Sequence, residues 1–157
     1  MRKTLYALLA LPLLACACTN GTDKVEKEAT DMLNTARSLM ISGNYAQARD
    51  TILSMRKRCP TALKARAVGI IVMDSIELLE AQDSLSIMDS TLQAEEDLLT
   101  QLEATKRRGH NAEYYKQRTK VFHLKQRFDE MGAKVKFYLR KIEVDQNENQ
   151  QAAEDRN

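Results

Sequence analysis

A long segment without proline, in which apolar residues recur at a fixed interval, is the feature that most constrains the fold of this chain. Between Thr61 and Arg107 the only glycine is Gly69, so a helix meets no strong breaker there. Apolar residues recur every seven positions, the period of a helix that packs on another helix along one seam. They are Ile71, Leu78, Leu85, Leu92 and Leu99. The segment therefore predicts a long helix that needs a partner.

A second segment with the same period supplies that partner. Apart from Gln117, its two seam columns are apolar throughout. They consist of Tyr114, Val121, Phe128, Val135 and Ile142, and of Leu124, Met131 and Tyr138. Gly109 and Asn111 suit a helix end and a helix start. We expect an antiparallel coiled-coil hairpin over residues 61–143 with its turn near 108–111. The alternative is that the same seams pair between two chains, which would make a homo-oligomer.

The charges of the two segments are complementary. Residues 67–105 carry nine acids and no base, whereas residues 106–141 carry twelve bases and three acids. Exposed pairs contribute little energy each, so these charges specify the pairing more than they stabilise it. An acidic partner within the chain also argues against nucleic acid as the ligand of the basic stretch.

Composition supports an all-α fold. Five glycines and two prolines in 157 residues leave few of the turns that a β fold needs. After the second seam, residues 144–157 are polar without apolar periodicity, and we expect a disordered tail.

The N-terminus has the pattern of a secretory signal peptide. Basic residues Arg2 and Lys3 precede an apolar run, Leu5–Leu14, that is too short to span a bilayer as a helix. The following Leu13-Leu14-Ala15-Cys16 resembles the lipobox of bacterial lipoproteins. The resemblance implies removal of residues 1–15, diacylglycerol on the Cys16 sulfur and a fatty acid such as palmitate on the new amino group. Cys18 is the alternative lipidation site, and an ordinary cleaved signal remains open.

Residues 16–28 are mostly polar and are interpreted as a lipidated tether. Ala17 follows the lipidated cysteine where an Asp would signal retention in the inner membrane, so the resemblance favours the outer membrane without deciding its face. A disulfide between Cys18 and Cys59 is one possibility. A small buried thiol at Cys59 is the other.

Residues 29–60 resemble a single tetratricopeptide repeat. The matching small, glycine and aromatic positions are Ala36, Gly43, Tyr45 and Ala48, and Pro60 follows at the end of the second helix. Physically, the alanines allow close helix approach, the glycine permits the turn and the proline stops the helix. One repeat cannot bury its own apolar face, so the start of the long helix is expected to cover this hairpin.

Motifs of catalysis are missing from the sequence. His110 and His123 stand in no metal-ligand spacing, and the pairs Asp74-Ser75, Asp83-Ser84 and Asp89-Ser90 have no base nearby. We therefore predict no enzyme activity, catalytic residue, metal, cofactor or small-molecule substrate.

In overall plan the chain resembles a group of lipoproteins of Gram-negative bacteria, which implies location and architecture but no activity. The interpretation that follows is a membrane-anchored helical adaptor or scaffold that binds another envelope protein. A holdase-like periplasmic chaperone with helical arms is the alternative, suggested by the arms and by seven methionines.

Overall fold

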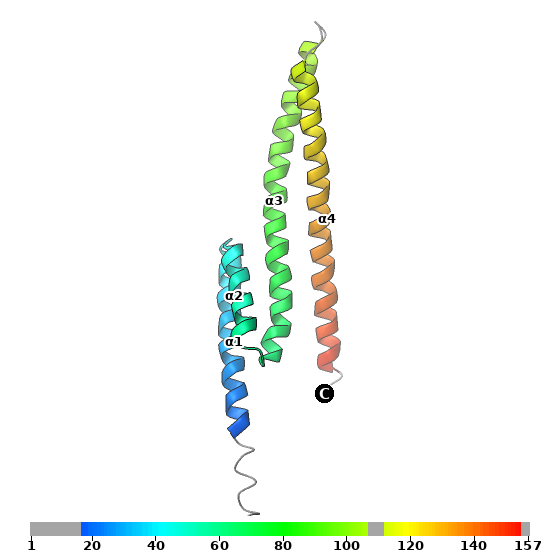
Figure 1. The fold of residues 1–157 in the computed structure, drawn as a ribbon. Coiled ribbons are helices and arrows are strands. Elements are labelled where there is room, and N and C mark those ends of the chain that lie inside the picture. Colours follow the sequence, from blue (N-terminus) through cyan, green and yellow to red (C-terminus); the bar gives the residue numbers. More distant parts are fainter. Residues whose placement is uncertain (1–16, 107–111, 155–157) are drawn as a thin grey trace, which may run out of the picture. The chain divides into compact units, whose positions relative to one another are not determined.

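The computed structural model describes residues 17–106 and 112–154, which form four helices and contain no strand. These are α1 (Ala17–Ile41), α2 (Tyr45–Arg58), α3 (Leu63–Lys106) and α4 (Ala112–Glu154) (Figure 1). The prediction of an all-α fold is confirmed. The chain divides into two compact units, Met1–Ile76 (unit 1) and Glu77–Asn157 (unit 2), and α3 contributes residues to both.

Unit 1 begins with a hairpin of α1 and α2. Gly43 closes the turn with a φ of 76°, a left-handed conformation that glycine adopts without steric cost. The Asn44 N–H donates to the Leu39 carbonyl at 2.9 Å, which ties the turn to the end of α1. At the other end α2 stops at Arg58, two residues before Pro60. The residues that the sequence assigns to the turn and the helix stop therefore occupy those places.

The core of unit 1 is shared by three helices. Ala36 of α1 and Ala48 of α2 are fully buried, as expected for alanines that let two helices approach. The beginning of α3 covers the hairpin. A methyl group added at Gly69 would lie 2.9 Å from Met55 Cε and 3.6 Å from Leu33 Cδ2. Gly69 is therefore buried against the hairpin, and a side chain at this position would require the end of the flexible Met55 side chain to move.

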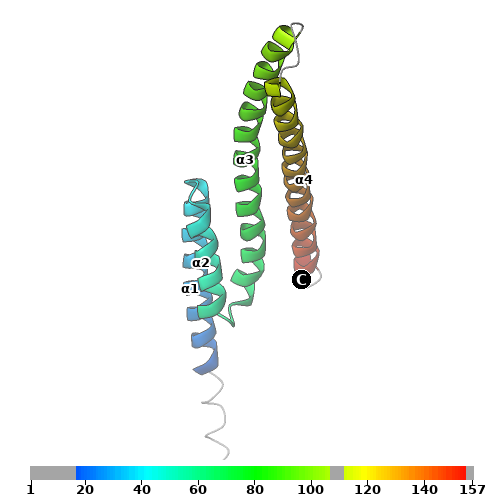
Figure 2. The same cartoon turned by 45° about the horizontal axis from the view of Figure 1, so that its top comes forward.

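Unit 2 is an antiparallel pair formed by α4 and the part of α3 that begins at Glu77, and the two helices lie side by side in Figures 1 and 2. Two ion pairs show the direction. Lys134 Nζ lies 3.5 Å from Glu77 Oε2, and Lys125 Nζ lies 2.6 Å from Glu96 Oε1. Residues later in α3 thus pair with residues earlier in α4. The predicted pairing within one chain is present.

Two segments differ from the sequence predictions. The tether expected over residues 16–28 is helical from Ala17, and Glu26 and Glu28 near its end contact Ala65 and Arg58 of unit 1. The tail expected to be disordered is helical as far as Glu154. It contains Glu, Gln and Ala, which have high helix propensity, so the helix continues without an apolar seam.

Several predictions fall on residues that the structure does not describe. They are the signal peptide, Cys16, and the turn with Gly109 and His110. The side chain of Cys18 is likewise outside the description. Among the described residues no helix is both long enough and apolar enough to cross a membrane.

Candidate interaction surfaces

A polar layer interrupts the apolar seam of unit 2. Gln117 is only 8% exposed, and its Nε2 donates hydrogen bonds to the backbone oxygen of Glu95 at 2.9 Å and to Glu95 Oε2 at 2.7 Å. Lys120 Nζ lies 2.7 Å from the other carboxylate oxygen, Oε1. Gln117, the polar exception in the second predicted seam, is thus paired with Glu95 of α3. Such a layer favours one register over its neighbours, because a shifted register leaves buried polar groups unpaired.

This layer stabilises the ionised form of Glu95. Hydrogen bonds from Gln117 and then from Lys120 lower the pKa of Glu95 below its ordinary value, against the opposing effect of burial. Because the folded-state pKa is lowered, the layer stabilises the fold above the unfolded-state pKa of Glu95. The contribution is lost as the pH falls through the folded-state pKa.

We predict that Gln117→Leu raises the pKa of Glu95 towards its ordinary value, because the largest cause of the shift is removed. The measurement is an NMR titration of the Glu95 side-chain carboxyl carbon. Gln93→Leu is the matched control, since Gln93 is exposed on the same helix as Glu95. An unchanged Glu95 pKa in Gln117→Leu would contradict the assigned layer.

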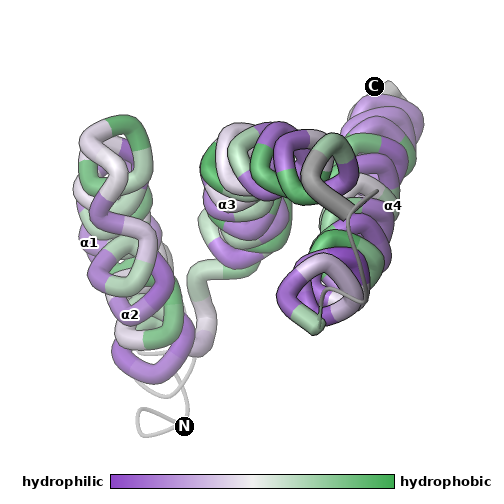
Figure 3. Tube along the Cα trace, turned by 90° about the horizontal axis from the view of Figure 1, so that it is seen from above, coloured by the Kyte–Doolittle hydropathy of each residue, from purple (hydrophilic) through white to green (hydrophobic). Residues whose placement is uncertain are grey.

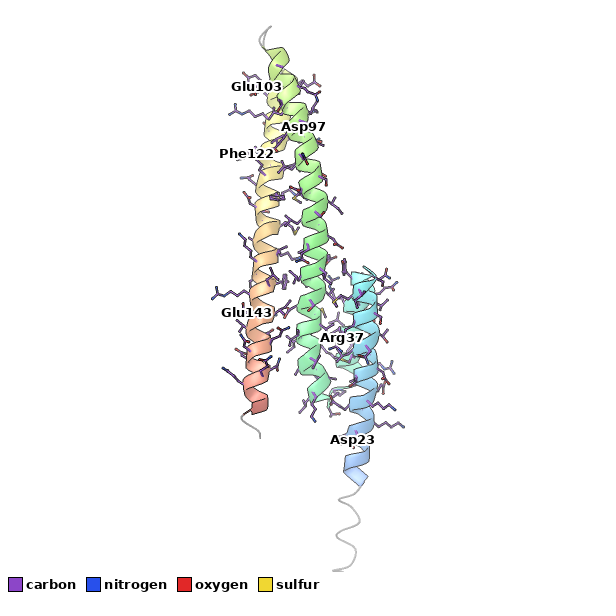
Figure 4. The ribbon with its side chains drawn as sticks, turned by 180° about the vertical axis from the view of Figure 1, so that it is seen from behind. Asp23, Arg37, Asp97, Glu103, Phe122 and Glu143 are labelled. Carbon is purple, nitrogen blue, oxygen red and sulfur yellow. The ribbon has the colours of Figure 1, made fainter. Side chains whose placement is uncertain are left out.

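The surface of α4 opposite the seam presents aromatic rings to solvent. Tyr115, Phe122 and Phe137 are 47%, 58% and 60% exposed. At 3.6 residues per turn these three positions fall within about 60° of arc, roughly opposite seam residues such as Leu124. Figure 4 shows Phe122 on the side of α4 away from α3. We call Tyr115, Phe122 and Phe137 the outer aromatic face.

Two sets of basic residues occupy α4. Lys120, Lys125 and Lys134 form ion pairs with glutamates of α3. Arg118, Lys136 and Arg140, which the helical period places beside the outer aromatic face, form no ion pair within the described residues. Figure 3 shows hydrophilic residues interspersed with hydrophobic ones along α4. Part of the charge complementarity predicted from the sequence thus takes the form of ion pairs between α3 and α4. Several other basic residues of α4 are available to another ligand.

The methionines do not form an exposed surface. Six of them lie in the described residues, and each is buried or half-buried. Met55 is fully buried, and Met32, Met40 and Met73 pack against the core of unit 1. The flexible Met-rich surface that would suit many clients is therefore not formed by these residues.

The histidines and Asp-Ser pairs considered as candidate catalytic or metal-binding residues are not assembled into a site in the described part of the chain. No group of three or more His, Cys, Asp or Glu side chains suited to a metal ion occurs in the described part of the chain. His123 is exposed, and its ring contacts Phe122. Ser75 and Ser90 donate hydrogen bonds to backbone oxygens one turn earlier in α3, at 2.8 and 3.2 Å. Asp74, the acid before Ser75, is 5% exposed.

Cys59 is a free and fully buried thiol, so the prediction of a small buried thiol at this position is confirmed. Burial and the neighbouring Glu28 raise its pKa, with Arg58 acting in the opposite direction. A raised pKa disfavours the reactive thiolate.

Comparison of the chain with protein-family models, curated proteins and solved structures finds no match. Its class is therefore defined by architecture: an all-α protein with a three-helix unit and an antiparallel helix pair.

Proposed function

We propose that this chain is a lipid-anchored, non-enzymatic helical adaptor or scaffold that binds another protein of the bacterial cell envelope, with the outer membrane as its location. The observation that carries the proposal is the outer aromatic face. Aromatic residues make up only 5% of the sequence, and yet three of them are exposed on one side of α4, spread over about 33 Å of helix.

Exposed aromatic residues that share one side of a helix are suited to contact with another protein. Tyr and Phe dominate the energy of protein interfaces because each buries a large apolar area with few rotatable bonds. Arg118, Lys136 and Arg140 flank the face and would select an acidic partner. A helix that presents aromatic and basic residues to a partner needs no cofactor or catalytic group. The arrangement therefore supports binding rather than catalysis.

The lipid anchor belongs to this proposal through the lipobox resemblance of Leu13-Leu14-Ala15-Cys16. Acyl chains on Cys16 would hold the chain on a membrane without a spanning helix. The alternative function, a holdase-like chaperone, predicts broad client binding. It draws less support, because the described methionines are buried or half-buried.

The test combines fractionation with site-specific crosslinking in the native envelope. We expect Cys16→Ser to move the protein out of the membrane fraction and Cys18→Ser, the matched control, to leave it there. In the anchored protein, a photo-crosslinking residue at Phe122 or Phe137 should capture one recurrent protein, whereas the same residue at the exposed Asn34 should not.

The outcomes separate the candidate functions. One partner captured at both aromatic positions, and lost with Arg118→Glu, supports an adaptor. Many unrelated proteins captured, together with suppressed aggregation of unrelated clients by the purified chain, would support the chaperone instead. Crosslinks equal at Asn34 and Phe122 would remove the outer aromatic face as the binding site.

A further inference from the structure

Unit 1 gathers basic residues from three separate segments at one end. Lys24 and Lys27 lie in α1, residues 56–58 end α2, and Lys64 and Arg66 begin α3. We call this set the basic end. Two contacts hold the segments together. Arg58 Nη2 pairs with Glu28 Oε1 at 2.6 Å, and Glu26 Oε1 accepts a hydrogen bond from the Ala65 N–H, also at 2.6 Å.

The positive charge of unit 1 is concentrated in these segments. Residues 56–66 carry five bases and no acid, and residues 21–28 carry two bases and three acids, a net charge of +4. The remaining described residues of the unit, 29–55 and 67–76, carry two bases and three acids. Two of the acids in α1 are already engaged, since Glu26 caps α3 and Glu28 pairs with Arg58. The basic end is therefore a positive surface on a unit that is otherwise nearly neutral.

The basic end is close in the sequence to Cys16, the residue proposed to carry the lipid. The helix α1 begins at Ala17, directly after Cys16, and extends beyond the end of α2 and the beginning of α3 (Figures 1 and 2). Glu28 pairs with Arg58 and lies eleven residues after Ala17, which corresponds to about 17 Å of helix. A helical link of this length keeps the basic end near the bilayer. If α1 is tilted, the long lysine and arginine side chains of the basic end reach the lipid headgroups.

Two further features of the basic end suit a lipid surface. Leu63 is 73% exposed between Pro60 and Lys64, so an apolar side chain is presented among cations. Lys24, Lys27 and Arg58 also line an open hollow of about 350 Å³, together with Glu28 and Asp31. Because Arg58 neutralises Glu28, the hollow retains positive charge where a phosphate headgroup could enter.

We infer that the basic end of unit 1 docks on the anionic phospholipid headgroups of the membrane that holds the anchor. The inference rests on the proposed lipid anchor, to which it adds a second contact. A polybasic surface beside an acyl anchor strengthens membrane attachment and orients the domain, and its strength falls with salt. Unit 1 would then be the membrane-facing part of the chain, and the α4 face would serve the protein partner.

The test uses the chain from Ala17 with Cys18→Ser, which retains every described contact because the buried core of unit 1 begins at Ala29. Vesicles of phosphatidylcholine, with and without phosphatidylglycerol, are sedimented with this protein. We expect binding only with phosphatidylglycerol, decreasing as salt is added. The triple variant Arg56→Gln, Lys57→Gln, Lys64→Gln should bind on the order of 100-fold more weakly, since each base at an anionic surface contributes about fivefold.

The matched control removes the same charge elsewhere. Arg37→Gln, Lys116→Gln, Arg127→Gln neutralises three exposed bases outside the basic end, and it should bind as the parent does. Leu63→Ser tests the apolar contribution without changing charge, and it should weaken binding about tenfold with an unchanged salt dependence. Circular dichroism of each variant verifies the helices.

Three results would overturn the inference. The first is equal binding of the protein to vesicles with and without phosphatidylglycerol. The second is an equal loss of vesicle binding in the basic-end triple variant and in the control triple variant. The third is a solution mass of the basic-end triple variant that differs from that of the parent, which would show that the basic end binds a second copy of the chain. The protein in this experiment has no acyl chain and meets no envelope protein. A negative result therefore leaves the adaptor proposal standing, and a failed crosslinking experiment leaves the vesicle result interpretable.

Discussion

Val121→Asp is expected to separate the helix pair of unit 2, with a loss of about 3 to 5 kcal/mol in the free energy of unfolding. The side chain of Val121 is 4% exposed in the seam. A carboxylate there would lose its hydration without gaining a partner. It would also face α3, whose residues 77–103 include eight acids and no base. Denaturant unfolding followed by circular dichroism measures the loss, and hydrogen exchange locates it in α3 and α4.

The matched control for this substitution is the next residue. Phe122 is 58% exposed on the outer aromatic face, so Phe122→Asp adds the same charge to solvent rather than to the seam. We expect its effect on unfolding to stay within about 0.5 kcal/mol. If Phe122→Asp were the more destabilising variant, the assigned seam would be displaced by one position and the outer aromatic face would be buried.

Ile52→Ala is expected to cost about 2 to 5 kcal/mol, because it removes methyl groups from a fully buried side chain and leaves a cavity. Ile52 lies in the small core shared by α1, α2 and the beginning of α3. A core of this size has few other contacts with which to compensate. Hydrogen exchange should show the loss of protection in residues 25–76.

The neighbouring residue again supplies the control. Leu53 has the same side-chain volume as Ile52 but is 43% exposed, so Leu53→Ala should cost less than about 1 kcal/mol. Equal losses for the two variants would mean that α2 is not held by its Ala48, Ile52 and Met55 side, and that the hairpin packs differently.

The positions of the helices and of the seam residues could be predicted from the sequence because they depend on local sequence patterns. A period of seven residues identifies the residues that face another helix, and it placed Leu92 and Val121 in a seam where both are buried. A glycine between two apolar segments identifies a turn, as Gly43 does. The outer aromatic face was missed, although the positions of Tyr115, Phe122 and Phe137 outside the seam columns were a usable signal.

Composition misled at both ends of the chain. The polar composition of residues 16–28 and 144–157 predicts a tether and a disordered tail, but α1 starts at Ala17 and α4 continues to Glu154. For α1, tertiary contacts support the last part of the segment that composition assigns to a tether. Glu26 and Glu28 make contacts with Ala65 and Arg58 that no local pattern reveals.

The amino-acid sequence by itself determined that this protein is helical, where its turn at Gly43 lies and which residues form its seams. Those properties follow from backbone preferences and periodicity within a few helical turns. Tertiary structure alone decided that Gln117 pairs with Glu95 and that bases from α1, α2 and α3 share one end of unit 1. The physical reason is that such contacts join residues 22 to 39 positions apart, so they exist only after the helices have packed.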